Sequence, residues 1–157
     1  MLEYWSGLQG TDPVLRKELL NRLDFPSSAL SRPVRTYSQG MAKKLSIVQA
    51  LQHDPSVIIL DVPTSSLDPL VQQTLFTILK EFKSKGSTVF MSSHNLNDVQ
   101  RVCDRIAMIN NGSIIAEGDV SKMIDSAERS VEIKFSDKNT PDLSKLTGVT
   151  NIVEDNE

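Results

Sequence analysis

The feature that most constrains this chain is the apolar run Ser56 to Asp61, in which four consecutive hydrophobic residues lead into a carboxylate. A run of this length without polar alternation is typical of a strand buried on both faces of a parallel sheet. Asp61 then falls at the carboxyl end of that strand, where open α/β sheets place their ligands. In isolation, the same pattern also fits a solvated aspartate at a strand end that binds nothing. The flanking sequence therefore has to decide between a ligand site and a solvated residue.

A second apolar run, Thr88 to Ser92, ends two residues before His94. The segment between the two runs predicts a helix from Pro69 to about Phe82, because Asp68 before Pro69 is a typical helix start. Gly86 is a typical helix end. Strand, helix and strand together predict a right-handed βαβ unit. A carboxylate and a histidine therefore follow two successive strands of one parallel sheet.

A third polar cluster, Ser38-Gln39-Gly40, stands at the start of an amphipathic pattern that predicts a helix through Leu51. Ser38 is a favourable N-cap, and Gly40 lets backbone amides approach a ligand closely. Free N–H groups and the helix dipole both favour negative charge at a helix start, so this one is a candidate anion site. Taken alone, the pattern is that of any capped amphipathic helix.

Shorter signals predict further elements. Thr11-Asp12-Pro13 indicates the start of a helix whose apolar face includes Val14, and Leu2 to Leu8 indicates a short helical piece before it. Asn111-Gly112 between two apolar runs indicates a β-hairpin. The alternation from Ser130 to Phe135 indicates an exposed strand.

Five motifs follow one another in a fixed order along the chain: Y-S-Q-G-M from Tyr37, H-D-P from His53, V-I-I-L-D-V-P-T-S-S-L-D-P from Val57, M-S-S-H-N-L from Met91 and I-N-N-G-S-I-I-A-E-G from Ile109. In this order and spacing they resemble the C-terminal half of an ABC transporter ATP-binding subunit, over roughly Leu2 to Met123. The resemblance implies an α/β fold that is a partial P-loop NTPase-like (ABC ATPase) fold. Its parts are a parallel sheet with flanking helices, a helical segment at the N-terminus and a β-hairpin after the switch histidine.

The resemblance also implies a role for each polar cluster. Ser38, Gln39 and Gly40 match the signature loop, which in this family contacts the γ-phosphate of ATP bound to the opposite subunit. Asp61 matches the acidic residue that holds Mg²⁺ through water, and His94 matches the catalytic switch histidine near the γ-phosphate. The loop that crosses the dimer interface matches Ser65, Ser66, Leu67 and Asp68. ATP and Mg²⁺ are the implied cofactors.

Two departures from the family pattern bear on catalysis. The sequence contains neither a G-x-x-x-x-G-K-[ST] motif, which cradles the phosphates, nor the glutamine loop that normally precedes the helical subdomain. The residue after Asp61 is Val62, where the family has a glutamate that polarises the attacking water. Valine has no lone pair to accept a proton, so it cannot act as a general base. We therefore expect no ATPase activity from this chain alone.

The resemblance and the change of character along the chain predict three parts. Residues 1–36 are part of a helical subdomain, residues 37–125 are the C-terminal part of the ATPase core, and residues 126–157 begin a C-terminal extension. An ordinary helical hairpin is the alternative for the first part. The net charge of -3 argues against a nucleic-acid partner. A single cysteine, Cys103, excludes an internal disulfide, and its helical spacing from Val99 predicts a small core residue.

Three functions stay open at this point. The first is an ATP-binding subunit, present as its C-terminal portion, that couples ATP binding and hydrolysis to transport across a membrane. The second is a catalytically degenerate or regulatory cassette, or a truncated split-gene product, that dimerises without turning over ATP. The third is a non-transport member of the same ATPase superfamily. The resemblance implies three partners at the cytoplasmic face of the cell membrane: a second ATPase subunit, a membrane-spanning permease subunit and a separate N-terminal half carrying the phosphate loop.

Overall fold

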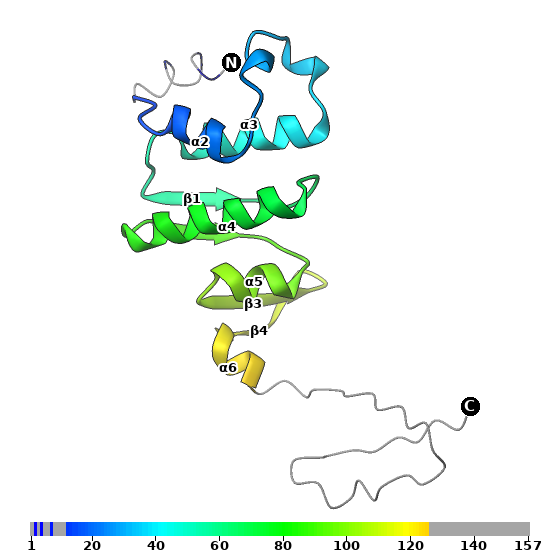
Figure 1. Ribbon diagram of the computed structural model, residues 1–157. Helices are drawn as coiled ribbons and strands as arrows, with labels where there is room; N and C mark the ends of the chain where they lie inside the picture. The colour runs from blue at the N-terminus through cyan, green and yellow to red at the C-terminus, as the bar shows by residue number, and fades with distance from the viewer. Residues whose placement is uncertain (1, 3, 5–6, 8–11, 126–157) are drawn as a thin grey trace, which may run out of the picture. The chain divides into compact units, whose positions relative to one another are not determined.

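The computed structural model describes residues 2, 4, 7 and 12–125, which belong to one compact α/β unit. The elements follow in the order α2 (Arg16–Arg22), η1 (Ser27–Ala29), η2 (Val34–Thr36), α3 (Gln39–Leu51), β1 (Val57–Leu60), α4 (Pro69–Ser84), β2 (Thr88–Met91), α5 (Leu96–Val102), β3 (Arg105–Asn110), β4 (Ser113–Asp119) and α6 (Val120–Asp125) (Figure 1). The predicted strand from Ser130 lies outside the described residues, as does most of the predicted helix Leu2 to Leu8. No described helix has the length and hydrophobicity that a bilayer span requires.

The predicted parallel strand, helix, strand unit is confirmed. β1 pairs with β2 in parallel register from Val57 opposite Thr88 to Leu60 opposite Met91, and α4 connects them. α4 begins as its sequence predicts, because the Asp68 side chain accepts a hydrogen bond from the Val71 N–H at 3.0 Å and proline takes the first helical position. The fold class is therefore the α/β class expected from the sequence.

Only one face of this two-stranded sheet is buried. Ile58 and Leu60 lie in the core, whereas Ile59 and Phe90 are 73% and 70% exposed. The prediction that the first strand is buried on both faces is wrong for this chain. Successive side chains point to opposite faces of a strand, and the described residues cover the sheet from one side only.

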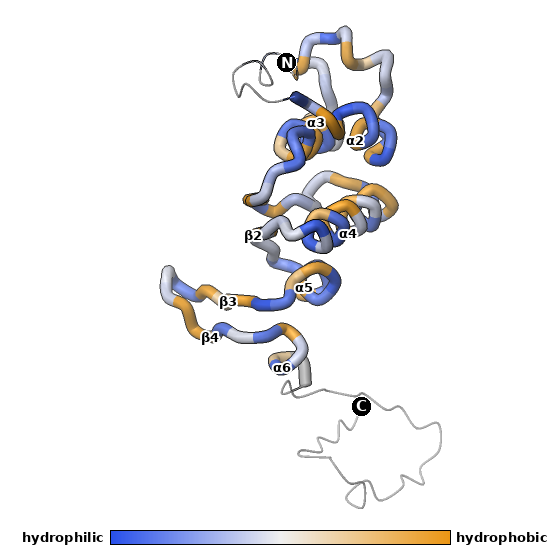
Figure 2. Tube along the Cα trace, turned by 90° about the vertical axis from the view of Figure 1, so that its left-hand side faces the viewer, coloured by the Kyte–Doolittle hydropathy of each residue, from blue (hydrophilic) through white to orange (hydrophobic). Residues whose placement is uncertain are grey.

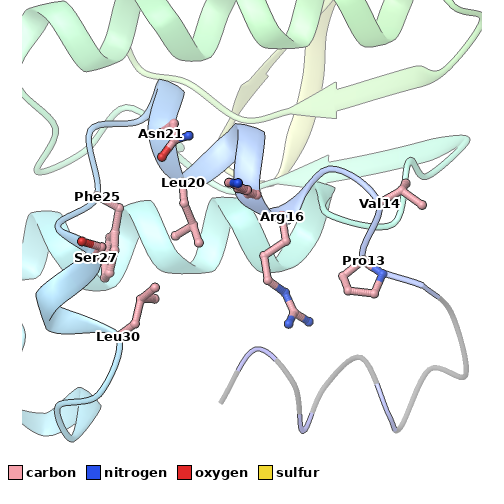
Figure 3. A pocket seen from close by; sticks show the side chains of 9 residues that line it. Pro13, Val14, Arg16, Leu20, Asn21, Phe25, Ser27 and Leu30 are labelled. Carbon is pink, nitrogen blue, oxygen red and sulfur yellow. The ribbon is translucent and has the colours of Figure 1, made fainter.

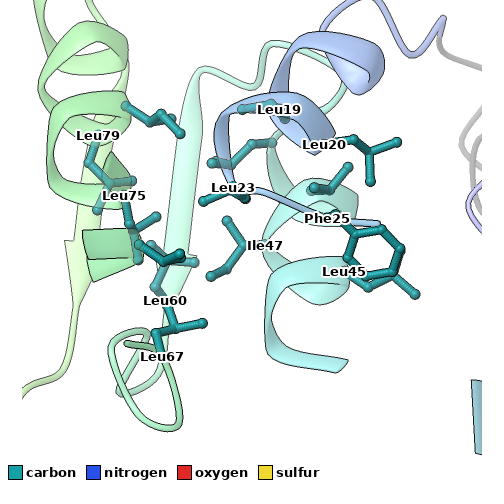
Figure 4. Packing of buried hydrophobic residues seen from close by; sticks show 14 of the residues in the cluster. Leu19, Leu20, Leu23, Phe25, Leu45, Ile47, Leu60, Leu67, Leu75 and Leu79 are labelled. Atoms are coloured by element: carbon teal, nitrogen blue, oxygen red, sulfur yellow. The ribbon is translucent and has the colours of Figure 1, made fainter. Parts of the chain in front are cut away.

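The hydrophobic core joins α2, α3, α4 and the buried face of β1. Figure 4 shows Leu19 and Leu23 of α2, Ile47 of α3, Leu60 of β1 and Leu75 of α4 directed toward one another. Burying one such side chain stabilises the fold by about 1.5–3 kcal/mol. The core therefore fixes the start of α3 and the carboxyl end of β1 relative to each other, and these two points carry the candidate site.

α2 begins later than the sequence predicts. Its first residue is Arg16, and the cap residue Leu15 makes no side-chain capping bond, so a start at Thr11-Asp12-Pro13 is wrong. Val14 is exposed, which also contradicts its predicted place on the apolar face. The cause is a long-range contact, because the Leu15 N–H donates to the Gln52 carbonyl at 3.1 Å beyond the end of α3. The chain enters the helix only after this contact.

β3 and β4 form the predicted hairpin. They pair antiparallel around Asn111 and Gly112, whose φ angles of 48° and 77° fit a two-residue turn with both central residues left-handed. Figure 2 shows hydrophobic residues on both strands, and Ile109 and Ile114 face each other across the ladder with exposed side chains. Cys103, which precedes β3, is half-buried against the core, and burial raises the pKa of its thiol.

Candidate functional site

Asp61 and Ser92 lie beside each other at neighbouring strand ends. Each follows its strand at the next position of the parallel register, so the sheet itself brings the two side chains together. The Ser92 hydroxyl donates to Asp61 Oδ1 at 2.5 Å and accepts from the Val62 N–H at 2.9 Å. The sequence predicted a site at Asp61 but missed Ser92. The signal was present, because a serine follows the second strand at the matching position.

A cationic group stands next to this carboxylate. The Lys43 ammonium, on α3, donates to the Asp61 carbonyl oxygen at 3.1 Å. Both residues border an open cavity of about 220 Å³ between α3 and β1. The cavity is lined by Lys43, Ser46, Ile47, Ala50, Ile59, Leu60, Asp61 and Pro63. Oxygen ligands and a positive charge thus meet at one edge of the sheet, an arrangement that suits a metal-bound anion.

The start of α3 packs against the loop that follows β1. Ser38 caps the helix by accepting a hydrogen bond from the Met41 N–H at 3.2 Å, as its sequence predicts. A Cβ atom at Gly40 would lie 2.9 Å from the Ser66 carbonyl oxygen, and the Ser66 hydroxyl donates to Gln39 Oε1 at 3.4 Å. Only glycine allows this close approach. The structure therefore brings together two clusters that the sequence analysis singled out separately.

The loop between β1 and α4 has an unusual backbone. Val62 and Ser66 have φ angles of 38° and 62°, in the left-handed region. This conformation costs an L-residue about 1–2 kcal/mol, and β-branched residues such as Val62 rarely adopt it. The Ser65 hydroxyl donates to the Val62 carbonyl at 3.0 Å and helps to hold this turn. Ser65 and Ser66 are exposed, whereas Leu67 is buried in the core and Asp68 caps α4. Of the four predicted interface residues, Leu67 alone is buried, and Asp68, although exposed, is engaged in capping α4.

His94 follows β2 in a loop that a buried carboxyl group ties to the loop after β1. Its imidazole is exposed and makes no hydrogen bond to the part of the chain that the structure describes, so it is available to a ligand. The preceding residue, Ser93, lies 3.5 Å from Asp98 Oδ2, and the Thr64 hydroxyl donates to the same oxygen at 2.9 Å. Sequence reasoning missed Thr64 and Asp98, because nothing local links residues 34 positions apart.

The donors at the strand ends fit part of a Mg²⁺ shell. Mg²⁺ prefers oxygen ligands and commonly takes one or two carboxylates together with water and substrate phosphates. Asp61 and Ser92 supply exposed oxygen atoms of that kind. Across residues 2, 4, 7 and 12–125, no group of three or more His, Cys, Asp and Glu side chains could hold a metal ion. The remaining ligands would therefore come from water and phosphate.

A separate cavity of about 430 Å³ lies between α2 and η1 (Figure 3). Its lining combines apolar and basic side chains: Pro13, Val14, Arg16, Lys17, Leu20, Asn21, Phe25, Ser27 and Leu30. The Arg16 guanidinium donates to Gln52 Oε1 at 2.8 Å and to the Leu2 carbonyl at 3.1 Å, which fixes one wall of the cavity. None of its lining residues lines the cavity at the strand ends.

Comparison with known proteins shows the family to which this chain belongs. Residues 12–97 match a family model described as "AAA domain, putative AbiEii toxin, Type IV TA system". An uncharacterized ABC transporter ATP-binding protein of Nostoc sp. is 37% identical over 100 residues, which are 64% of this chain and 30% of that protein. The lantibiotic transport ATP-binding protein SrtF of Streptococcus pyogenes is 41% identical over 105 residues, which are 67% of this chain and 43% of SrtF.

A solved structure agrees with the sequence relatives. A structure titled as the ATP binding subunit of an ABC transporter superposes with a TM-score of 0.70 at 28% sequence identity, covering 79% of this chain and 53% of that one. This chain thus spans about a third to a half of the length of the proteins it matches. The chain belongs to the family of this AAA-domain model, and the relatives and the solved structure that it resembles are ABC transporter ATP-binding proteins.

Proposed function

We propose that this chain contributes the C-terminal portion of an ABC transporter ATP-binding subunit, and that it holds part of an ATP site without completing one. The observation that carries the proposal is the pairing of Asp61 with Ser92 at neighbouring strand ends, beside Lys43. Ligands of open α/β sheets bind at this edge. The packing of Gly40 against Ser66 supports the same function, because it joins the anion-binding helix start to the exposed interface loop.

Each site residue has a part in this function. Asp61 holds Mg²⁺ through water, and the backbone at Ser38, Gln39 and Gly40 faces the γ-phosphate of ATP on the opposite subunit, where the helix dipole favours negative charge. His94 stabilises charge that spreads over the oxygens of the transferred phosphoryl group. Mg²⁺ held through water by Asp61 would neutralise part of that charge. The loop Ser65 to Asp68 crosses the dimer interface, with its two serines outward.

The partners follow from surfaces that this chain leaves open. The exposed sheet face with Ile59 and Phe90 fits an N-terminal half that carries the phosphate loop, since parallel sheets are normally covered on both faces. A second ATPase subunit meets the interface loop. The cavity between α2 and η1 fits a permease segment at the cytoplasmic face of the membrane. Residues 1–36, 37–125 and 126–157 serve as helical subdomain, core and extension in this assembly.

A second candidate is a degenerate cassette that binds ATP and dimerises without efficient turnover. Val62 favours it, because this residue follows Asp61 directly and offers no group that could polarise water. Loss of a positioned general base typically lowers a rate by about 10²–10⁴. The two candidates differ in turnover and agree on ATP binding.

The test completes the cassette by fusing the N-terminal portion of SrtF to this chain. Phosphate release is measured for the chimaera with Val62 and with Val62→Glu, each with and without His94→Ala. We expect slow release with Val62 and a rate at least about tenfold higher with the glutamate, which is the direction that restoring a general base predicts. His94→Ala should lower the rate of the glutamate form.

Two results would decide against parts of this proposal. A chimaera with Val62 that releases phosphate as fast as the glutamate form would mean that another group acts as the base. A Val62→Glu chimaera whose rate is unaffected by His94→Ala would remove the histidine from the reaction.

A further inference from the structure

Asp98 is a buried carboxyl group that the proposed function does not use. It lies on α5 and is 6% exposed, and the Thr64 side chain next to it is 8% exposed. The Thr64 hydroxyl donates to Asp98 Oδ2 at 2.9 Å. A carboxyl group is seldom buried unless its oxygens are hydrogen-bonded, so this contact is a requirement of the fold at this point.

The contact links two loops that are far apart in the sequence. Thr64 belongs to the loop after β1, which continues to the exposed serines Ser65 and Ser66. Asp98 stands four residues after His94, and the Ser93 hydroxyl also approaches Asp98 Oδ2, at 3.5 Å. Asp98 Oδ2 therefore accepts hydrogen bonds from hydroxyl groups of both loops.

The two hydroxyl groups hold this oxygen unequally. Ser93 has a single hydroxyl proton, and the Asn95 carbonyl at 3.3 Å is a second acceptor for it. A long, shared hydrogen bond is weak, so Ser93 can release Asp98 at little cost. Thr64 has no second acceptor within the described residues and makes the shorter bond. The hydrogen bond from Thr64 to Asp98 is thus the stronger of the two, and the hydrogen bond from Ser93 is the weaker.

The loop after β1 is itself held by side-chain hydrogen bonds from α4. The Gln72 amide, on α4, donates to the carbonyl oxygens of Thr64 at 3.1 Å and of Leu67 at 3.0 Å. If a second subunit displaced Ser65 or Ser66, Thr64 would therefore move with them. Through its hydrogen bond to Asp98, Thr64 would then displace Asp98 and the start of α5.

We propose that Asp98 is a positioning residue that couples the exposed loop Ser65 to Asp68 to the loop that carries His94. The proposal rests on the proposed function for the roles of these two loops. Contact of the interface loop with a second subunit then sets the position of His94 through the Thr64 to Asp98 bond. Asp98 touches neither nucleotide nor metal in this account and acts only through the loops.

Amide hydrogen exchange on the full chain tests the coupling without nucleotide. The reporter amides are Leu67, which bonds the Thr64 carbonyl, and Asn95, which bonds the Ser93 hydroxyl. Thr64→Val removes the donor while keeping the shape, and should speed exchange by about tenfold at both reporters, the order expected for one net hydrogen bond. Thr64→Ser keeps the donor and should restore slow exchange at both. Asp98→Asn keeps an acceptor and should change exchange less than Asp98→Ala.

Thr77→Val is the matched control. It removes a hydroxyl that donates to the Gln73 carbonyl within α4, and it should leave both reporters unchanged. Faster exchange at Leu67 alone after Thr64→Val would overturn the coupling. Equal acceleration at the Gln52 amide, which bonds Val48 at the end of α3, would also overturn it, because the contact would then support only the fold as a whole.

A kinetic experiment distinguishes a failure of this coupling from a failure of the proposed function. In the Val62→Glu chimaera, Thr64→Val should lower kcat several-fold with little change in the KM for ATP, and Thr64→Ser should restore kcat. An unchanged kcat contradicts the coupling. A chimaera that binds no ATP contradicts the proposed function instead, and exchange at Leu67 and Asn95 then decides the coupling by itself.

Discussion

Val62, the residue after Asp61, combines two properties that bear on the proposed site. Its side chain has no lone pair, and its backbone takes a left-handed conformation that valine disfavours. The turn persists because Ser65 and Ser92 both bond the Val62 backbone. At this scale the site is defined by backbone geometry as much as by side chains. Gly40 is the second example, since its missing Cβ is what lets Ser66 approach.

Gly40→Ala tests that close approach. Alanine is favoured over glycine inside a helix by about 0.5–1 kcal/mol, so a helix without tertiary contacts would become more stable. Here the new Cβ would stand 2.9 Å from a backbone oxygen of Ser66 that cannot rotate away. We expect the steric cost of overpacking to exceed the gain in helix propensity by about 1–3 kcal/mol. The Tm should then fall by several degrees in thermal unfolding followed by circular dichroism.

Gly118→Ala is the matched control for this change. Its Cβ would meet only the Met123 side chain, at 3.8 Å, which is ordinary van der Waals contact. Its Tm should stay near that of the unchanged chain. A Gly40→Ala variant as stable as the control would mean that the interface loop yields easily and does not need glycine.

At the scale of elements, the predictions that succeeded rest on local chemistry. The caps at Ser38 and Asp68 and the turn at Asn111-Gly112 depend on residues a few positions apart, and all are confirmed. The start of α2 and the burial of both faces of β1 were predicted wrongly, because each depends on contacts with distant parts of the fold. Asp61 was predicted from its place after a strand, whereas its partner Ser92 required the register between two strands.

An ion pair between elements gives the structure a pH-dependent contact. The Arg22 guanidinium of α2 binds both carboxylate oxygens of Glu81 on α4, at 2.5 and 2.7 Å. This hydrogen bonding lowers the pKa of Glu81 below its ordinary value of 4.5. A depressed carboxyl pKa stabilises the folded state above that ordinary value, and the contribution is lost as the pH falls through the lower folded value.

Glu81→Gln should therefore destabilise the chain at pH 7 and matter less in acid. Because both side chains are partly exposed to solvent, we expect a loss below about 1 kcal/mol at pH 7. Urea unfolding across a pH series should show the difference from the unchanged chain shrinking as the pH falls below 4.5. The control is Glu117→Gln on β4, where the structure shows no ion pair among the residues it describes. A difference that stays constant with pH would contradict the pairing as its cause.

At the scale of the whole molecule, the described residues expose apolar surface on the parallel sheet and on the hairpin. Ile59 and Phe90 are exposed on the sheet, and Ile109 and Ile114 are exposed on the hairpin. The segments that two relatives share with this chain are only 30% and 43% of the relatives' own lengths. Both facts support the proposed ATP site, in which Asp61, His94 and the helix start at Ser38 would lie on this chain and the phosphate loop on a further part.

Calorimetric titration of ATP with Mg²⁺ tests this division most directly. The full chain and its chimaera with the N-terminal portion of SrtF are titrated under the same conditions. Asp61 and His94 supply only part of the contacts to Mg²⁺ and phosphate, so the chain alone should give no binding heat. The chimaera should bind ATP with a micromolar Kd. Micromolar binding by the chain alone, or no binding by a folded chimaera, would contradict the account.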